Sequence, residues 1–177
     1  MHVERAQPKD LAAIQGAYER GRAIHREHGE VPWPAFGDEQ LLAEMRAGGL
    51  FRVTDGDTLA GVFSVAHEDA QIWGELERGT HIYLHRITRA DNPSGGSIVG
   101  AIVDWGLAQC DTLGREGLRM DATSTNAPLL AYYAKFGFDT VAKRLMPTDP
   151  ALSPHYHGVE LALLERPLIV AEQNSSA

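Results

Sequence analysis

Paired glycines at the start of a predicted helix are the first feature of the sequence that could do chemistry. The turn Ser94-Gly95-Gly96-Ser97 leads from a predicted strand into an apolar helical pattern over residues 97–113. Backbone N–H groups and the positive end of the helix dipole would meet there and attract an anion. Glycines in this place can also serve the turn alone. No Lys-Ser or Lys-Thr pair follows them, and the third glycine of the dinucleotide fingerprint cannot be placed, so neither well-known phosphate loop fits.

A second candidate is the strand predicted by "THIYLHRIT", residues 80–88. Alternation divides its side chains between two faces, one with His81, Tyr83, His85 and Ile87 and the other with Ile82, Leu84, Arg86 and Thr88. One face therefore offers polar rings to a cleft. The unperturbed pKa of histidine, about 6.5, suits proton acceptance near neutrality, which makes His85 a candidate base. The alternatives are a buried histidine bonded to a backbone carbonyl and a water relayed from Glu68 or Asp121.

A third candidate is the helix for which Asn126 is the predicted N-cap and which extends through Lys135. Pro128 is tolerated in its first turn, because the missing N–H has no helical partner there. The helix carries the pair Tyr132-Tyr133, and a tyrosine hydroxyl can donate a proton. Tyrosines on an apolar helix can also pack in the core, and we assign that role to Tyr132.

Residues 61–141 resemble the GNAT acetyltransferase superfamily. The family pattern is a strand, a pyrophosphate loop, a long helix, a strand, and a short helix that ends in "Y-x-K-x-G-F", with an asparagine seven residues before the tyrosine. This chain has Asn126 and then "YAKFGF" from Tyr133 onward. The loop departs from the pattern, because Ser94 stands where glutamine or arginine is usual, and Ser97 and Val99 stand where glycines are usual. Backbone amides survive such substitutions.

The resemblance implies direct transfer of an acetyl group from acetyl-CoA to the primary amine of a small molecule or peptide. It implies that Tyr133 is the general acid for the departing thiolate and that His85 is the base. The backbone of residues 87–89 would pair with the pantetheine amides of the cofactor like an added strand. The residues expected at the cofactor are Ile87, Thr88, Arg89, Ser94, Gly95, Gly96, Ser97, Ile98, Val99, Asn126 and Lys135.

The acceptor pocket is predicted from aromatic and imidazole side chains in loop-like segments, where such groups often bind ligands. These are Trp33, Trp73, His155 and His157, with Glu68 and Asp121 added as carboxylates. The histidines of "HYH" and the carboxylates of "HED" could in principle ligate a metal, but their spacing matches no zinc motif. We therefore expect no metal site.

These candidates require an α+β fold to bring them together. The patterns predict a strand, two helices, a strand hairpin turned by Asp55-Gly56-Asp57 and a further strand, followed by helix, strand, helix and two strands. This order predicts a GNAT-like twisted mixed sheet of six to seven strands flanked by about four helices, with one parallel crossover through residues 97–113. We expect one domain over residues 1–168 and a flexible tail over residues 169–177.

The composition limits the class of protein. Of the 177 residues, 44% are hydrophobic, which is enough for one sizeable core, and the net charge of −8 without a basic cluster disfavours a nucleic-acid surface. The single Cys110 excludes an intrachain disulfide. No apolar run approaches the roughly 20 residues of a membrane span, so we expect a cytoplasmic protein with no membrane partner. The family resemblance adds a homodimer to these expectations.

Two other functions stay open at this point. The altered glycine turn favours a non-catalytic acyl-CoA-binding or interaction module with a GNAT-like fold, whereas the intact Tyr133 and His85 argue against it. The second alternative is a metal hydrolase that depends on the histidines.

Overall fold

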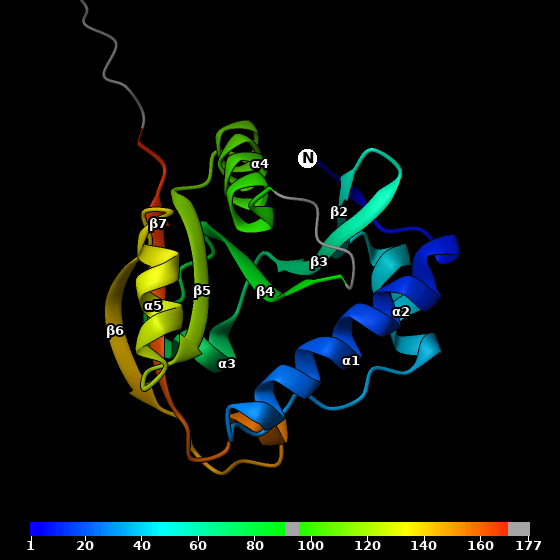
Figure 1. Cartoon of the computed structure of the whole chain (residues 1–177). Coiled ribbons are helices and arrows are strands. Elements are labelled where there is room, and N and C mark those ends of the chain that lie inside the picture. Colours follow the sequence, from blue (N-terminus) through cyan, green and yellow to red (C-terminus); the bar gives the residue numbers. More distant parts are fainter. Residues whose placement is uncertain (91–95, 170–177) are drawn as a thin grey trace, which may run out of the picture.

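A mixed sheet of seven strands runs through the protein, of which the computed structural model describes residues 1–90 and 96–169 (Figure 1). The strands lie in the order β1-β2-β3-β4-β5-β7-β6, and in the described chain β4 and β5 form the one parallel pair. The strands are β1 (His2–Arg5), β2 (Leu50–Asp55), β3 (Thr58–Ala66), β4 (His81–Arg89), β5 (Gly117–Thr123), β6 (Asp139–Leu145) and β7 (Glu160–Pro167). The helices are α1 (Leu11–Glu27), α2 (Asp38–Ala47), α3 (Ala70–Trp73), α4 (Ile98–Leu113) and α5 (Ala127–Ala134), with 3-10 turns η1 (Pro8–Asp10), η2 (Gly74–Leu76) and η3 (Pro154–Tyr156).

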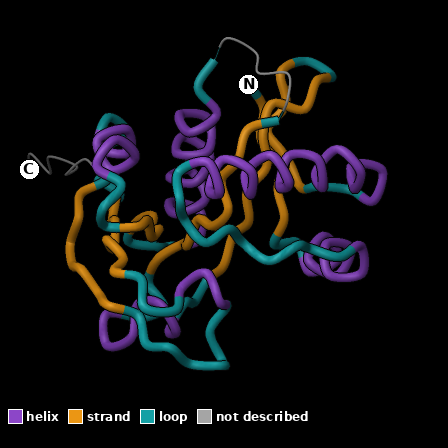
Figure 2. Tube along the Cα trace, turned by 60° about the horizontal axis from the view of Figure 1, so that its bottom comes forward, coloured by secondary structure: helices purple, strands orange, loops and turns teal. Residues whose placement is uncertain are grey.

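Helices cover both faces of the sheet, as two successive residues of β3 show. Val62 packs with residues of α1 and α2, among them Ile14 and Leu41. The next residue, Phe63, packs with α4, including Ile102. Because neighbouring strand residues point to opposite faces, α1 and α2 lie on one side of the sheet, and α4 lies on the other side together with α5. Figure 2 shows the long helix α1 crossing the strands.

Strands β4 and β5 pair only at their beginnings. Their ladder holds three pairs, of which the last joins Tyr83 to Arg119. The remaining residues of both strands separate, and Figure 1 shows the two arrows diverging. The side of β4 that faces β5 therefore leaves backbone groups without a strand partner over residues 84–89, among the residues that the structure describes.

Strand β4 carries a β-bulge at Arg86. The pairing register shifts between Val62 and Ser64 of β3, where one residue of β3 opposes two of β4, Arg86 and Ile87. Arg86 has a φ of 53°, and within residues 1–90 and 96–169 it is the one residue other than glycine with a positive φ. A bulge of this kind bends the strand and shifts the faces of the residues that follow it.

The bulge corrects the faces that we predicted for this strand. Alternation puts Arg86 and Thr88 on the face that packs against α4. The Arg86 guanidinium instead lies 5.3 Å from the centroid of the Tyr18 ring on the α1 side. The Thr88 hydroxyl also turns to that side, where it donates to the backbone carbonyl of Ala17 at 3.4 Å. Ile87 packs into the core on the α4 side.

The Arg86 side chain holds the bulge against α1 and α2. Its two terminal nitrogens bond both carboxylate oxygens of Glu44, and its Nε donates to Ser64 Oγ at 3.0 Å. The guanidinium also stacks on Phe36, 4.7 Å from the ring centroid. A non-glycine residue in the left-handed region costs about 1–3 kcal/mol, so these contacts must outweigh that strain.

Helix α3 was not predicted, and it corrects the expected loop around Trp73. The helix lies between β3 and β4 and buries Ile72 and Trp73 in a cluster with Tyr83 and Met146. Trp73 is 1% exposed, and the Arg119 guanidinium lies 4.2 Å from its ring centroid. Cation–π stacking and burial therefore leave this indole no surface for an acceptor molecule.

The predicted α+β class is confirmed, with seven strands in a mixed sheet and the parallel crossover through α4. No helix within residues 1–90 and 96–169 is long and apolar enough to cross a membrane. The predicted tail lies outside the described residues except for Ile169, which is 81% exposed.

Arg86→Ala tests the anchoring of the bulge. Alanine keeps the strained backbone but loses the ion pair with Glu44 and both ring contacts, so we expect the free energy of unfolding to fall by about 2–4 kcal/mol. Urea unfolding of both proteins measures this difference. Glu19→Gln, which removes an ion-pair partner on the exposed surface of α1, is the control and should leave the unfolding midpoint unchanged. A midpoint for Arg86→Ala equal to that of the wild type would contradict the anchoring role.

Candidate active site

Three ionisable side chains meet where β4 and β5 separate. His85 lies on β4, Asp121 on β5, and Asp69 at the start of α3. His85 Nε2 is 3.5 Å from Asp69 Oδ2, and His85 Nδ1 is 3.9 Å from Asp121 Oδ1. The side chains of Asp69 and Asp121 are 13% and 10% exposed. We call these three residues the Asp-His-Asp cluster.

The segment between β6 and β7 closes over this cluster. The Tyr156 hydroxyl, from η3, hydrogen-bonds the carboxyl group of Asp121. The ring of Tyr156 stacks on His155 with 4.0 Å between centroids. Burial lowers the pKa of His155 to about 4, and His25 of α1 adds to this effect, so the end of α1 lies near η3. We refer to these two segments as the wall of α1 and η3.

Burial sets the protonation of the cluster. It raises the pKa of Asp121 to about 7, with a further contribution from the charge of Asp69. Burial also raises the pKa of Asp69 to about 6. Burial and then the Arg86 charge lower the pKa of His85 to about 4. At neutral pH His85 is therefore a neutral imidazole with a free lone pair, and it stands between two carboxyl groups that can stabilise an imidazolium.

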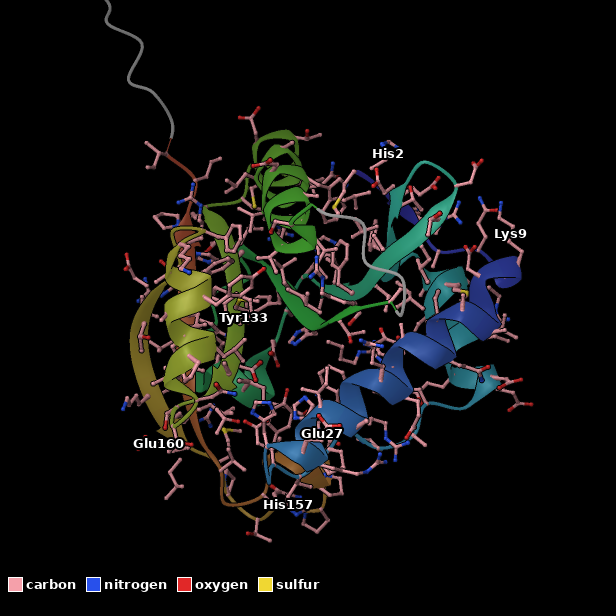
Figure 3. All side chains as sticks on the ribbon, in the orientation of Figure 1. His2, Lys9, Glu27, Tyr133, His157 and Glu160 are labelled. Atoms are coloured by element: carbon pink, nitrogen blue, oxygen red, sulfur yellow. The ribbon has the colours of Figure 1, made fainter. Side chains whose placement is uncertain are left out.

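Tyr133 lies on the side of α5 that faces the sheet (Figure 3), near enough to Asp121 of the cluster for that carboxyl group to affect it. Burial raises its pKa, and the neighbouring Tyr132 and Asp121 raise it further, so the hydroxyl keeps its proton as a donor. The packing role that we assigned to Tyr132 is corrected. Tyr132 is 38% exposed, whereas Tyr133 is 9% exposed and packs against Phe138 in the core.

The predicted cofactor strand offers its backbone rather than its side chains. Ile87 packs into the core, and Thr88 bonds α1 through its hydroxyl. The Arg89 guanidinium donates to the carbonyl of Gly96 at 2.8 Å and so ties the end of β4 to the start of α4. The free edge of residues 84–89 is the part of this strand that an extended ligand can reach.

The glycine turn is described from Gly96 onward, and Ser94 and Gly95 lie outside the described residues. Ser97 is the N-cap of α4, since its hydroxyl accepts from the N–H of Gly100 at 3.1 Å. Ile98 and Val99 are 2% and 4% exposed, so they are core residues. The first N–H groups of α4 therefore form the part of this turn that can bind an anion.

Both the oxygen and the nitrogen of the Asn126 amide group form hydrogen bonds with other residues of the chain. Its Oδ1 accepts from the N–H of Leu129 at 3.2 Å, which confirms the predicted cap of α5. Its Nδ2 donates to Glu30 Oε1 at 3.1 Å, and Glu30 also contacts His25 Nδ1 at 2.9 Å. Asn126 thus ties α5 to the segment that follows α1. Lys135 follows α5 as its C-cap and is exposed.

The structure places the predicted acceptor residues in different surroundings. Trp33, 4.7 Å from the His25 ring, and His155 belong to the wall formed by α1 and η3. Glu68 is exposed next to Asp69. His157 Nε2 contacts the carbonyls of Asp149 and Leu152, so it also braces its own loop.

Sequence reasoning missed Asp69 and Tyr156. The signal for Asp69 was the "HED" stretch, in which an aspartate precedes a short apolar segment as an N-cap would. The ligand-type atoms of Asp69, His85 and Asp121 lie within 4.8 Å of one another, close enough to hold one divalent cation. That the protein uses no metal stays a prediction.

Comparison with solved structures identifies the fold. An acetyltransferase of the GNAT family from Listeria monocytogenes aligns over 94% of both chains with a TM-score of 0.70 and 20% identity. YncA, a putative acetyltransferase from Salmonella typhimurium solved with its cofactor acetyl-CoA, aligns over 100% of this chain and 99% of its own, with a TM-score of 0.66 and 14% identity. The ribosomal-protein-S18-alanine N-acetyltransferase from Escherichia coli covers 98% and 97%, with a TM-score of 0.64 and 13% identity.

These structures establish that the chain has the GNAT fold, as the motif around Tyr133 predicted. No protein-family model matches the sequence, and no curated protein does. At these identities the likeness establishes the arrangement of the backbone, and the chemistry has to be argued from the side chains.

Asp121→Asn tests the buried charge of the cluster. The folded-state pKa of Asp121, about 7, lies above the ordinary value of 3.8, so ionisation of this group destabilises the fold as the pH rises from about 4 to 7. The asparagine variant lacks this cost. We expect it to be more stable than the wild type at pH 8, by on the order of 4 kcal/mol from the pKa difference, and equally stable near pH 4.

Chemical denaturation from pH 4 to 8 measures this difference. Asp139→Asn on the exposed start of β6 is the control for the same change in charge. A stability difference between the Asp121 variant and the wild type that does not change with pH would show that the Asp121 carboxyl is not perturbed.

Proposed function

We propose that this protein transfers an acetyl group from acetyl-CoA to the primary amine of a small molecule or peptide. One observation carries the proposal. The neutral His85 and the largely buried carboxyl groups of Asp69 and Asp121 meet where β4 and β5 separate, and the buried Tyr133 lies near Asp121. The amine attacks the carbonyl carbon of the thioester, the new N–C bond forms, and the C–S bond breaks. The amine must lose a proton and the thiolate gains one.

His85 is proposed to accept the proton of the amine. Its lowered pKa leaves it unprotonated before reaction, and the carboxyl groups of Asp69 and Asp121 stabilise the imidazolium that forms. Tyr133 is proposed to give its proton to the thiolate, since its raised pKa keeps the hydroxyl protonated until then. Acetyl-CoA supplies the activated acetyl group when it is bound.

The backbone is proposed to hold the cofactor. The unpaired edge of Ile87, Thr88 and Arg89 offers groups for the pantetheine amides. The N–H groups at the start of α4, over residues 96–99, offer donors for the pyrophosphate, and Ser94 and Gly95 are expected to extend this cradle. Asn126 and Lys135 stand at the two ends of α5.

The acceptor is proposed to enter beside the wall of α1 and η3. Trp33, His155 and His157 lie in or beside that wall, Glu68 lies next to Asp69 of the cluster, and Asp121 belongs to the cluster itself. The acidic side chains favour an amine that arrives as a cation.

A non-catalytic acyl-CoA-binding or interaction module is the second candidate. It is favoured by the serines at positions 94 and 97 and by Val99, which replace the residues usual in this family's loop. It is also favoured by Arg89, whose guanidinium is already engaged with the Gly96 carbonyl.

Gly96→Pro tests the cofactor cradle. Proline removes one loop amide and restricts φ, so we expect micromolar binding of acetyl-CoA to the wild type and a loss of at least about tenfold in the variant, measured by calorimetry. Gly96→Ala is the matched control, because it keeps the N–H and its Cβ meets only the flexible end of Met1. If both variants bind like the wild type, the cradle lies elsewhere, and if the wild type does not bind, the interaction module becomes the better assignment.

Tyr133→Phe tests the general acid. With an accepted amine, we expect kcat to fall by about a hundredfold or more, while the Kd of acetyl-CoA stays within about twofold of the wild-type value. A thiol-release assay over a panel of primary amines measures the rate. Tyr132→Phe removes the exposed neighbouring hydroxyl and should keep full activity. Unchanged turnover in Tyr133→Phe would rule out this role.

A further inference from the structure

We infer that Asp69 sets the tautomer of His85, so that the ring proton stays on Nε2 and the Nδ1 lone pair is free to accept a proton. Asp69 is thus a positioning residue that acts through His85. The inference rests on the proposed function, in which His85 receives the proton of the amine.

The first step of the argument is that the carboxyl group of Asp69 is held in place. Its Oδ1 accepts from the N–H of Ile72 at 3.4 Å as the N-cap of α3. The backbone N–H of Asp69 donates to Glu77 Oε2 at 2.8 Å, and Glu77 Oε1 accepts from the N–H of Gly79 at 2.6 Å. The cap and this carboxylate bridge fix the orientation of Asp69, and Oδ2 is left pointing to the cluster.

The second step is that Oδ2 of Asp69 needs a donor. This oxygen is buried and has no hydrogen-bond partner among the described residues. A buried acceptor without a donor costs about 1–3 kcal/mol. His85 Nε2 is 3.5 Å away, slightly beyond a direct hydrogen bond, and such contacts in free enzymes often shorten when the substrate binds. A proton on Nε2 satisfies Oδ2.

The third step concerns the other ring nitrogen. Nδ1 faces Asp121 Oδ1 at 3.9 Å, and Asp121 already receives a hydrogen bond from the Tyr156 hydroxyl. Nδ1 therefore lies on the side where β4 and β5 separate. Its neighbour there is the Asp121 carboxyl group, whose oxygens can accept a hydrogen bond, whereas Asp69 faces the other ring nitrogen. In the transfer step the amine proton moves to Nδ1, the N–C bond forms, and the C–S bond breaks. The proton on Nε2 stays in place.

Two substitutions at position 69 separate the tautomer from the charge. Asparagine caps a helix as well as aspartate does, but its amide NH₂ would then face Nε2. That nitrogen must accept, so the proton moves to Nδ1 and blocks the base. Serine also caps a helix and also lacks the charge. Its hydroxyl is one bond closer to the backbone than Oδ2 of aspartate and can accept as well as donate, so it does not force Nε2 to accept. Glu75→Gln, an exposed carboxylate in the adjacent η2 turn, is the control for loss of charge in the same segment.

The first measurement is ¹⁵N NMR of the His85 ring in the protein without ligands. We expect the proton on Nε2 in the wild type and in Glu75→Gln, and on Nδ1 in Asp69→Asn. A wild-type ring protonated on Nδ1, or an Asp69→Asn ring still protonated on Nε2, would overturn the inference. Because this readout needs no turnover, it decides the inference even if no amine is acetylated, which would count against the proposed function alone.

The second measurement is the rate of acetyl transfer. In serine proteases the same exchange of aspartate for asparagine beside a histidine lowers kcat about 10⁴-fold through the wrong tautomer. We expect Asp69→Asn to lose at least about a hundredfold in kcat, and Asp69→Ser to lose clearly less. Serine as damaging as asparagine would assign the loss to charge or folding and would overturn the inference, as would an active asparagine variant.

Discussion

The strand that carries His85 in the candidate site is anchored by the bulge at Arg86. A regular strand would turn Arg86 away from α1, but the extra residue puts His85 and Arg86 on the same side of the sheet. His85 keeps the face that alternation gives it, toward Asp69 and Asp121. Arg86 anchors the next residue of β4 to Glu44 and to the rings of Tyr18 and Phe36. Because the backbone at Arg86 is strained, the bulge persists only while these contacts are made. The packing of α1 and α2 thereby supports the geometry of the site.

Two kinds of buried ionisable group lie close together on β5, and their charges are compensated in different ways. Arg119 of β5 is 7% exposed, but it is paired with Glu165 at 2.8 Å and 2.9 Å, bonded to Tyr83 and stacked on Trp73. Every part of that guanidinium is compensated, as a structural buried ion requires. The two carboxyl groups of the cluster have a neutral histidine between them instead, and their pKa values rise as a result of burial. Buried carboxyl groups without a cationic partner lower the stability of the fold, and such uncompensated groups are typical of functional sites.

The sequence predicted the features that depend on local signals. The Asp55-Gly56-Asp57 turn, the Asn126 cap, and the order of strands along the chain are set by residues close together in the chain, and the structure has them. The predicted assignment of side chains to the two faces of β4 is wrong beyond His85. Alternation assumes a regular pleat, whereas this strand has a bulge that contacts with α1 and α2 stabilise. Trp73 was placed in a loop because the apolar segment around it is only one turn long. The cluster could not be foreseen, since its members come from three separate elements and only the fold brings them within 4 Å of the same ring.

The proposed site divides its tasks between backbone groups and side chains. A ligand held by the free edge of β4 and by the first N–H groups of α4 is held by atoms that every residue except proline provides. Substitutions at Ser94, Ser97 and Val99 therefore change this part less than their side chains suggest. Proton transfer and acceptor choice need particular side chains, and in the proposed mechanism these come from β4, β5, α3, α5 and η3. The proposed cofactor contacts therefore depend mainly on the backbone, whereas the proposed chemistry depends on the side chains of His85, Asp69, Asp121 and Tyr133.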